Sequence, residues 1–541
     1  MIVLKTVNSL VKVFENEEPS GEEKESVMLK GEKYNFQLVI DNENYVLFNC
    51  SVEVTGDIAE YVTVRDVVSL PATVLPSVED NYTYGNDRGL YPELLKPFGK
   101  TGLVLKERRR HAVYVSIDGT GDIPVGKHEI RLAVRNDKGE TLAETSYYIT
   151  VYGEKLADTD LKITHWMHYD GIAEKHGVKL FDDDFYKIFG KYLEAYVDTG
   201  NNMLLTPLFT PPLDTYVGGE RLTAQLVKVK VTGKDYGFDF SALGKFIDFA
   251  EEKGIKYFEM SHLFTQWGGA ACPKIIAEKD GKEQRIFGWE TDSLSDDYVG
   301  FLKAFLPALC DFLRGKGLGG KCYFHLTDEP HATHIERYAK LKDIVKGLIG
   351  EFKTMDALSN YEFYEQGLVD VAVPYIPSYE KEFRGKDIPE LFVYYCGGNS
   401  AYYTGRIFDM PLQRARVLGY NLYEAGVNGF LDWGFNFYNT TMSYASVDPY
   451  TDTGAGGGFL SGDSFIVYPD KDGVSYSVLA EALGEGFRDY RLLKTLEKMI
   501  GREKTVGILR EEGVKNFYEY PRSAERHLSV RKRIIEEIVG K

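Results

Sequence analysis

The sequence predicts an α/β fold in which a (β/α)8 TIM barrel is preceded by an antiparallel β-sandwich domain and followed by C-terminal helices. A chain of 541 residues is too long for one ordinary hydrophobic core. Short alternating runs dominate up to about residue 155, and beyond it strands alternate with amphipathic helices. We therefore expect the β-sandwich over 1–155, the barrel over 156–480 and helices over 481–541 that pack on the barrel.

The first predicted domain consists of short runs in which apolar and polar residues alternate. Two of them, HEIRLAVRNDKGE and TSYYITVYG, flank Asn136-Asp137-Lys138-Gly139, a composition typical of a hairpin turn. The others are YNFQLVI, FNCSVEVTG and HAVYVSIDG. Residues 80–98, DNYTYGNDRGLYPELLKPF, are rich in Tyr, Asn and Pro, and we expect there a long ordered loop that leans on the second domain.

The second predicted domain contains eight strand candidates separated by helical stretches. Eight strand-helix alternations over roughly 330 residues favour a closed barrel over an open sheet. No GxGxxG follows the first strand, which weakens the dinucleotide-binding alternative. Residues 451–463, TDTGAGGGFLSGD, lack the ending of a phosphate-binding loop and predict a mobile loop over the site. The strand candidates are ITHWMH, NMLLT, KYFEM, CYFHL, TMDAL, VDVAVP, LFVYYC and GFLDW.

Composition and charge exclude several classes of protein. The net charge of -18 would repel a phosphate backbone, so nucleic acid is not an expected partner. Neither a signal peptide nor a long apolar stretch is visible, which predicts a cytoplasmic protein without membrane insertion. The 5 cysteines are scattered and His331 and His334 lack the HExxH arrangement, so we expect neither metal nor other cofactor. The 38 tyrosines suit a carbohydrate site, because Tyr joins a flat apolar face to a hydroxyl.

The sharpest local signal is CYFHLTDEPHATH, in which a buried strand runs directly into Asp328, Glu329 and a proline. In a barrel, the residues that follow a strand face the mouth of the active site. Side chains that alternate on a regular strand can share one pocket where the backbone turns at its end. We therefore predict that Asp328 and Glu329 are catalytic. The alternative is structural: Asp328 would cap the next helix and Glu329 would form an ion pair.

A pair of carboxylates suits the hydrolysis of glycosidic bonds, which needs a proton donor and a group that stabilises the oxocarbenium-like centre. The seventh strand candidate, LFVYYCGGNS, ends without the carboxylate that would serve as nucleophile in many barrel glycosidases. An adjacent Asp-Glu pair instead fits catalysis in which the substrate's 2-acetamido oxygen attacks. Glu329 would then be acid and base, and Asp328 would stabilise the acetamido group. Tyr375, Tyr394 and Tyr395 are candidates for holding the acetamido oxygen.

Other polar and aromatic residues at predicted strand ends complete a sugar pocket. An aromatic face covers the C–H surface of a pyranose, and amides, imidazoles and carboxylates reach its hydroxyls. Asp432 and Glu259 also keep open a conventional mechanism with two carboxylates. The further predicted substrate-binding residues are Trp166, His168, His262, Trp267, Asn399, Asp432, Trp433 and Asn436.

Several stretches together resemble glycoside hydrolase family 123 over essentially the whole chain. They are HLTDEP, THWMHYD, LLTPLFTPPLDT, FEMSHLFTQWGG, GFLDWGFNFYN and SYSVLAEALGEGFRDYRLL. Characterised members are β-N-acetylgalactosaminidases that work by substrate assistance. The resemblance thus implies Asp328 as the stabiliser, Glu329 as the acid/base, and an oligosaccharide or glycoconjugate with terminal β-linked GalNAc as substrate. Two alternatives remain: a glycosidase for a sugar without an acetamido group, and a noncatalytic carbohydrate-binding protein.

Overall fold

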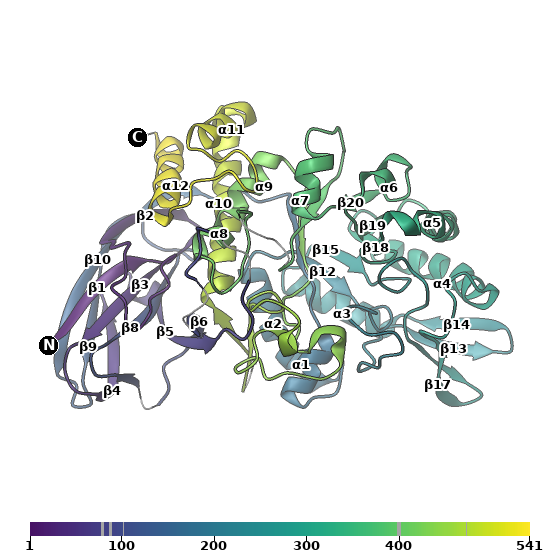
Figure 1. Cartoon of the computed structure of the whole chain (residues 1–541), viewed down its shortest axis with the longest axis horizontal. Helices are drawn as coiled ribbons and strands as arrows, with labels where there is room; N and C mark the ends of the chain where they lie inside the picture. The colour runs from purple at the N-terminus through teal and green to yellow at the C-terminus, as the bar shows by residue number, and fades with distance from the viewer. Residues whose placement is uncertain (77–79, 86–88, 101, 398–401, 472, 541) are drawn as a thin grey trace.

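The computed structural model describes all residues except 77–79, 86–88, 101, 398–401, 472 and 541. Figure 1 shows an elongated molecule, with the N-terminal strands at one end and the parallel strands with their helices toward the other. The chain is a mixed α/β protein with a β-rich N-terminal part, which confirms this much of the predicted fold class.

Two sheets that share a hydrophobic core form the N-terminal part, and the rings of Phe36 and Tyr147 stack inside it with centroids 3.8 Å apart. The hairpin predicted around Asn136 is confirmed, because β9 and β10 pair antiparallel on either side of it. Among the described strands of these two sheets, only β2 pairs in parallel, with β10. The first sheet runs β1 (Ile2–Asn8), β3 (Lys33–Asn42), β8 (Arg109–Asp118), β5 (Val62–Pro71), β6 (Leu90–Lys96), β24 (Gly473–Ser477), β23 (Tyr468–Asp470), and the second β2 (Glu25–Lys30), β10 (Thr141–Lys155), β9 (Gly126–Arg135), β4 (Leu47–Thr55), β7 (Leu103–Leu105).

The first sheet includes strands from the far end of the sequence. β24 pairs antiparallel with β6, joining residues Tyr476 and Leu95, and leads directly into α10 (Val478–Ile500). Part of the expected loop over 80–98 is thus a strand, because β6 occupies 90–96. The residues before it do contact the second part of the chain, since Tyr84 N donates to Asp409 O over 2.6 Å. Residues 86–88 of this loop lie outside the described residues.

All eight predicted parallel strands are present, in two sheets in which every pairing is parallel. Single parallel bridges, Ala372 to Leu391 and Tyr375 to Tyr394, link the end of one sheet to the other. On the opposite side, Asn202 N donates to Ile163 O over 3.1 Å. One sheet runs β12 (Met203–Thr206), β15 (Tyr257–Met260), β18 (Cys322–His325), β19 (Lys353–Ala357), β20 (Val371–Val373), and the other β11 (Lys162–His165), β22 (Gly429–Asp432), β21 (Phe392–Tyr394).

Helices follow most of these strands, and their ends match local sequence signals. Asp182 accepts a hydrogen bond from Phe185 N at the start of α2, and Ser295 accepts one from Tyr298 N at the start of α4. A small sheet that the sequence did not reveal stands beside α4 and consists of β14 (Asp235–Asp239), β13 (Lys228–Thr232), β16 (Ile275–Lys279) and β17 (Lys282–Phe287). The α-helices of this part are α1 (Tyr169–His176), α2 (Asp183–Asp198), α3 (Ser241–Glu252), α4 (Asp296–Gly315), α5 (Ile335–Ile349), α6 (Tyr361–Glu365), α7 (Ile376–Ser378), α8 (Leu412–Arg416) and α9 (Leu418–Ala425).

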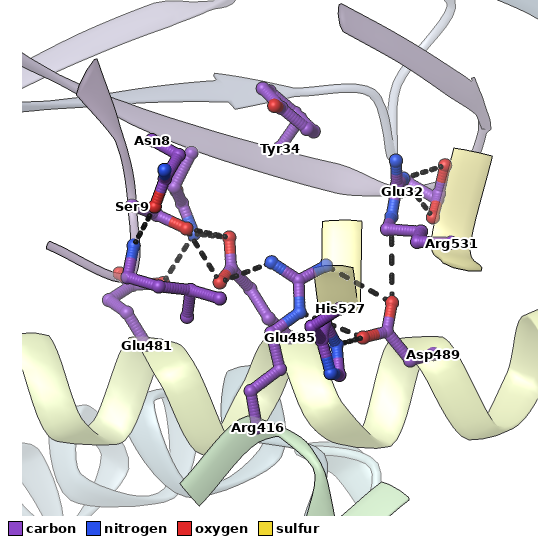
Figure 2. A network of polar contacts seen from close by, with 12 residues as sticks. Asn8, Ser9, Glu32, Tyr34, Arg416, Glu481, Glu485, Asp489, His527 and Arg531 are labelled. Atoms are coloured by element: carbon purple, nitrogen blue, oxygen red, sulfur yellow. Dashed lines mark hydrogen bonds and ion pairs between the residues drawn. The ribbon is translucent and has the colours of Figure 1, made fainter. Parts of the chain in front are cut away.

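A buried network of charged side chains joins α10 to both parts of the molecule (Figure 2). Arg416 at the end of α8 binds Glu485 over 2.9 Å and Asp489 over 2.7 Å, both on α10. Ser9 Oγ after β1 also donates to Glu485. Arg531 on α12 (Ala524–Val539) binds Glu32, which precedes β3, over 2.9 Å. The C-terminal helices, which include α11 (Arg502–Glu511), therefore contact the N-terminal sheets as well as the helices around the parallel strands.

We found no helix with the length and apolar character of a membrane span in the part of the chain that the structure describes.

Candidate active site

A cavity of about 540 Å³ opens where the parallel strands end at their carboxyl side. Segments from both parts of the molecule line it. The N-terminal part contributes Val74, Pro76, Asp80 and Thr83. The wall formed by strand ends and the loops after them includes Trp166, His168, Asp214, Gln266, Trp267, Asp328, Glu329, Ala357, Tyr394, Cys396 and Trp433. The glycine-rich stretch predicted to cover the site adds Gly458, Phe459, Leu460 and Asp463.

Asp328 and Glu329 lie side by side in this wall, three and four residues after the last residue of β18. The backbone turns here: Asp328 O accepts a hydrogen bond from Trp267 N over 2.7 Å, and Glu329 N donates to Ala357 O over 3.0 Å. Glu329 has a φ of +47°, in the left-handed region that glutamate rarely adopts. This turn lets two consecutive side chains face one cavity. Strain of this kind concentrates at functional sites.

The groups around Asp328 and Glu329 set the charge of one carboxyl and fix the position of both. Burial raises the pKa of Asp328 well above its ordinary value, and the negative charge of Glu329 raises it further. The hydroxyl of Tyr394 donates to Glu329 Oε1 over 2.5 Å. Beneath the turn, Asp356 on β19 accepts hydrogen bonds from the backbone and hydroxyl of Thr327, both over 2.9 Å. The Asp356 carboxylate thus fixes the turn that carries the pair.

Three tryptophans face the cavity. Trp166 is fixed by a hydrogen bond, because its Nε1 donates to Glu259 Oε1 over 2.6 Å. Trp433 packs on Phe459 with ring centroids 4.7 Å apart. Trp267 stands at the rim with 38% of its surface exposed. Flat apolar faces of this kind suit the C–H surface of a sugar ring.

Five predicted substrate-binding residues do not line the cavity, and for them the prediction of direct contact is corrected. His262 is buried and stacks on the ring of His325, with centroids 4.3 Å apart. Tyr395 points into the core against Phe430, because neighbouring side chains alternate along a strand. Tyr375 is not among the lining residues and packs on Tyr394, with ring centroids 5.6 Å apart.

The other two of these five are buried polar residues with protein partners. Asp432 pairs with Arg406 over 2.7 Å, and burial raises the pKa of Asp432 to about 6. Asn436 exchanges hydrogen bonds with the backbone of His168, over 2.9 and 3.0 Å. Glu259, the other alternative partner carboxylate, is fully buried beneath Trp166 and does not line the cavity. Asn399 lies outside the described residues.

Asp80, Asp214, Asp409 and Asp463 line the cavity but were not predicted as site residues, and three of them, Asp80, Asp214 and Asp463, belong to sequence stretches quoted above. Asp214 follows β12 in the stretch LLTPLFTPPLDT, and burial raises its pKa to about 6. Asp463 ends the glycine-rich stretch, and burial raises its pKa to about 7, while a hydrogen bond from the Trp433 side chain acts in the opposite direction. A signal was available for each, since both carboxylates stand in stretches already singled out. Neither residue follows its strand directly, so a prediction based on the residues at strand ends does not include them.

The cavity can therefore donate and accept protons next to a bound sugar. Glu329 and Asp328 form an adjacent pair at one wall, and aromatic faces and further carboxyls complete the pocket. This combination of acids and flat apolar surfaces suits the binding and hydrolysis of a carbohydrate.

Comparisons with known proteins agree with this geometry. The model of the family "Glycoside hydrolase 123, catalytic domain" matches residues 166–496. A family 123 glycoside hydrolase from Clostridium perfringens, studied for glycolipid glycan hydrolysis, has a similar structure, with a TM-score of 0.73, 16% sequence identity, and coverage of 100% of this chain and 98% of that one. A search of curated protein sequences found no match.

Two other solved structures align only weakly with this chain. The endo-β-1,4-mannanase from Thermotoga petrophila aligns with a TM-score of 0.35 and 14% identity over 62% of this chain and 78% of its own. The β-glucuronidase of Parabacteroides merdae aligns with a TM-score of 0.34 and 11% identity over 90% of this chain and 52% of its own. These two scores are too low to support an argument. The family model covers more than half of the chain, and the chain therefore belongs to glycoside hydrolase family 123.

Proposed function

We propose that this glycoside hydrolase removes terminal β-linked N-acetylhexosamine, with a preference for GalNAc, by a retaining, substrate-assisted mechanism. The observation that carries the proposal is the adjacent pair Asp328 and Glu329, whose side chains line one sugar-sized cavity. Substrate assistance needs only one proton donor and one group that holds the acetamido nitrogen. The Clostridium perfringens relative acts on glycolipid glycans, which supports an oligosaccharide or glycoconjugate as the substrate.

In this mechanism Glu329 protonates the leaving oxygen as the acetamido oxygen attacks the anomeric carbon. The Glu329 carboxylate then takes a proton from the water that opens the cyclic intermediate. Tyr394 suits both steps, because its hydroxyl donates to Glu329 Oε1 and holds this side chain in place. Of the three candidate tyrosines, Tyr394 is the one found among the described lining residues. We therefore propose that it lies next to the acetamido group of the bound sugar.

Asp328 would accept a hydrogen bond from the acetamido N–H. Burial disfavours the charged form of this carboxyl. A bound N–H donor and the positive charge that grows on the oxazolinium-like intermediate both favour the carboxylate. The charged form of Asp328 is therefore favoured once the acetamido group is bound and the positive charge develops.

The position of other carboxylates supports substrate assistance over a conventional nucleophile. Glu259 and Asp432, the partners considered from the sequence, both lie outside the cavity wall and are bound to Trp166 and Arg406. Asp214 and Asp463 do line the cavity, so the experiment below includes them.

We also infer that the two parallel sheets form one closed (β/α)8 barrel over 156–480, between the β-sandwich and the C-terminal helices. The hydrogen bond from Asn202 N to Ile163 O and the bridges at Ala372 and Tyr375 support closure on both sides. In a closed barrel of this kind, the loops at the carboxyl end of the strands build the active site.

The experiment compares aryl β-glycosides of GalNAc, GlcNAc and galactose. We expect cleavage only of the two acetamido sugars, inhibition by a thiazoline mimic of the cyclic intermediate, and a loss of about 10²- to 10⁴-fold in kcat for Glu329→Gln. Asp214→Asn and Asp463→Asn should keep measurable turnover. Cleavage of the galactoside that thiazoline does not inhibit would refute substrate assistance. A covalent glycosyl-enzyme that disappears in either Asp variant would identify a conventional nucleophile.

A further inference from the structure

We propose that the cavity accepts only sugars without an anionic substituent, and that Asp214 and Asp463 exclude sulfated sugars and uronic acids. This inference rests on the proposed function and narrows its substrate class. It follows from the distribution of charge around the cavity.

The described lining residues include acidic residues from both parts of the molecule and neither lysine nor arginine. His168 adds no positive charge near neutral pH, because burial and the neighbouring Arg221 lower its pKa to about 4. The acidic lining residues are Asp80, Asp214, Asp328, Glu329, Asp409 and Asp463.

The buried arginines near the cavity already have partners. Arg406 binds Asp432 over 2.7 Å, and Arg414 forms an ion pair with Asp80. Both guanidinium groups are almost completely buried, with 1% and 0% of their side-chain surface exposed. Because both are enclosed by protein, neither can reach a sulfate or carboxylate of a ligand, which is the role arginine usually has in sites for anions.

Asp214 and Asp463 differ from these paired carboxylates. Asp214 accepts a hydrogen bond from Met442 N over 2.9 Å, and Asp463 is supported by the Trp433 side chain and the backbone of Gly397. Among the described residues, no lysine or arginine side chain forms an ion pair with either of them, although the charges of Arg221 and Arg406, which pair with Asp170 and Asp432, act to lower the pKa of Asp214 and of Asp463 respectively. Each carboxyl can therefore accept a hydrogen bond from a sugar hydroxyl.

An anionic substituent would meet these carboxyls where little water separates them. Like charges placed together in such a site weaken binding, whereas a neutral hydroxyl donates a hydrogen bond. The same wall that binds a plain sugar thus repels its sulfated form.

The test uses aryl β-GalNAc and its 6-sulfate and 6-O-acetyl derivatives, at about pH 8, where both carboxyls are ionised. The acetyl group is neutral and of similar reach, so it controls for size. We expect kcat/KM for the sulfate to be at least about 100-fold below that for the acetyl derivative. Asp214→Asn with Asp463→Asn should shrink this ratio about tenfold or more. The matched control, Asp296→Asn with Asp297→Asn, removes two exposed charges at the start of α4 and should leave the ratio unchanged.

A binding measurement separates this inference from the proposed reaction. Three of the chain's four tryptophans line the cavity, so intrinsic fluorescence can report binding of GalNAc and its 6-sulfate without turnover. Tighter binding of the neutral sugar with no hydrolysis of any aryl glycoside would support the charge selection and refute the proposed function. Values of kcat/KM for the sulfate and acetyl derivatives that lie within about threefold of each other would overturn the charge selection. A ratio of these values that the double Asp variant does not change would also overturn it.

Discussion

Replacing Asp463 with asparagine should stabilise the protein more at about pH 8 than at about pH 4. Asp463 is 2% exposed, and burial raises the pKa of its carboxyl from 3.8 to about 7. Between these two values the folded protein keeps a proton that the unfolded chain has released. The free energy of unfolding therefore falls as the pH rises from about 4, and the loss is complete above about pH 7. Asparagine has no charge and removes this loss.

The magnitude follows from the two pKa values. A change from 3.8 to about 7 is about 3 pH units, or at most about 4 kcal/mol at 1.36 kcal/mol per unit. For 541 residues, an unfolding entropy of about 2.1 cal/mol/K per residue sums to about 1.1 kcal/mol/K. The Tm of Asp463→Asn relative to the original protein should therefore rise by up to about 3 to 4 °C between these pH values.

The assay is thermal unfolding of the original protein, Asp463→Asn and Asp297→Asn across this pH range. Asp297 is exposed at the start of α4 and serves as the control, whose Tm should keep a constant difference from the original protein. A difference for Asp463→Asn that stays constant, or that shrinks as the pH rises, would show that this carboxyl is not destabilised by burial.

Three further changes test the site and its support. Tyr394→Phe removes the hydrogen bond to Glu329 and should lower kcat/KM about 10- to 100-fold in steady-state assays, whereas Tyr395→Phe, which alters a buried hydroxyl outside the cavity, should change it little. Glu329→Gly should be about 1 kcal/mol more stable than Glu329→Ala in urea unfolding, because glycine adopts a φ of +47° without strain; equal stabilities would argue against strain at this turn. Arg416→Met removes the arginine that pairs with two buried carboxylates of α10 and should cost about 3 to 5 kcal/mol, seen as a lower Tm; an unchanged Tm would contradict this.

The strands, the position of the acidic pair in the cavity wall and the family could be predicted because their signals are local. Each parallel strand is a short apolar run between polar segments, and Asp328 and Glu329 directly follow one of them. The motifs around the pair also led to the family that the comparison confirmed. The hairpin at Asn136 is a similar case, because the turn residues lie between the two strands they connect.

Local sequence patterns could not decide in which direction neighbouring side chains point. Tyr394 and Tyr395 are equivalent as sequence, yet only Tyr394 faces the cavity and donates to Glu329. Asp432 looks like a free carboxylate at a strand end until Arg406 is found beside it, 26 residues away in the sequence. Such pairs depend on which distant segments meet, and spacing along the chain carries no record of that.

The sequence by itself therefore determined the order of strands and helices, the position of the acidic pair and the family. Only the tertiary structure decided which carboxyls share the cavity with that pair. Asp214 and Asp463 reach it from loops and not directly from a strand end, and Val74, Pro76, Asp80 and Thr83 reach it from the N-terminal part. The physical reason is that a strand is specified by its own residues, whereas a cavity is specified by the contacts between segments that are distant in the chain.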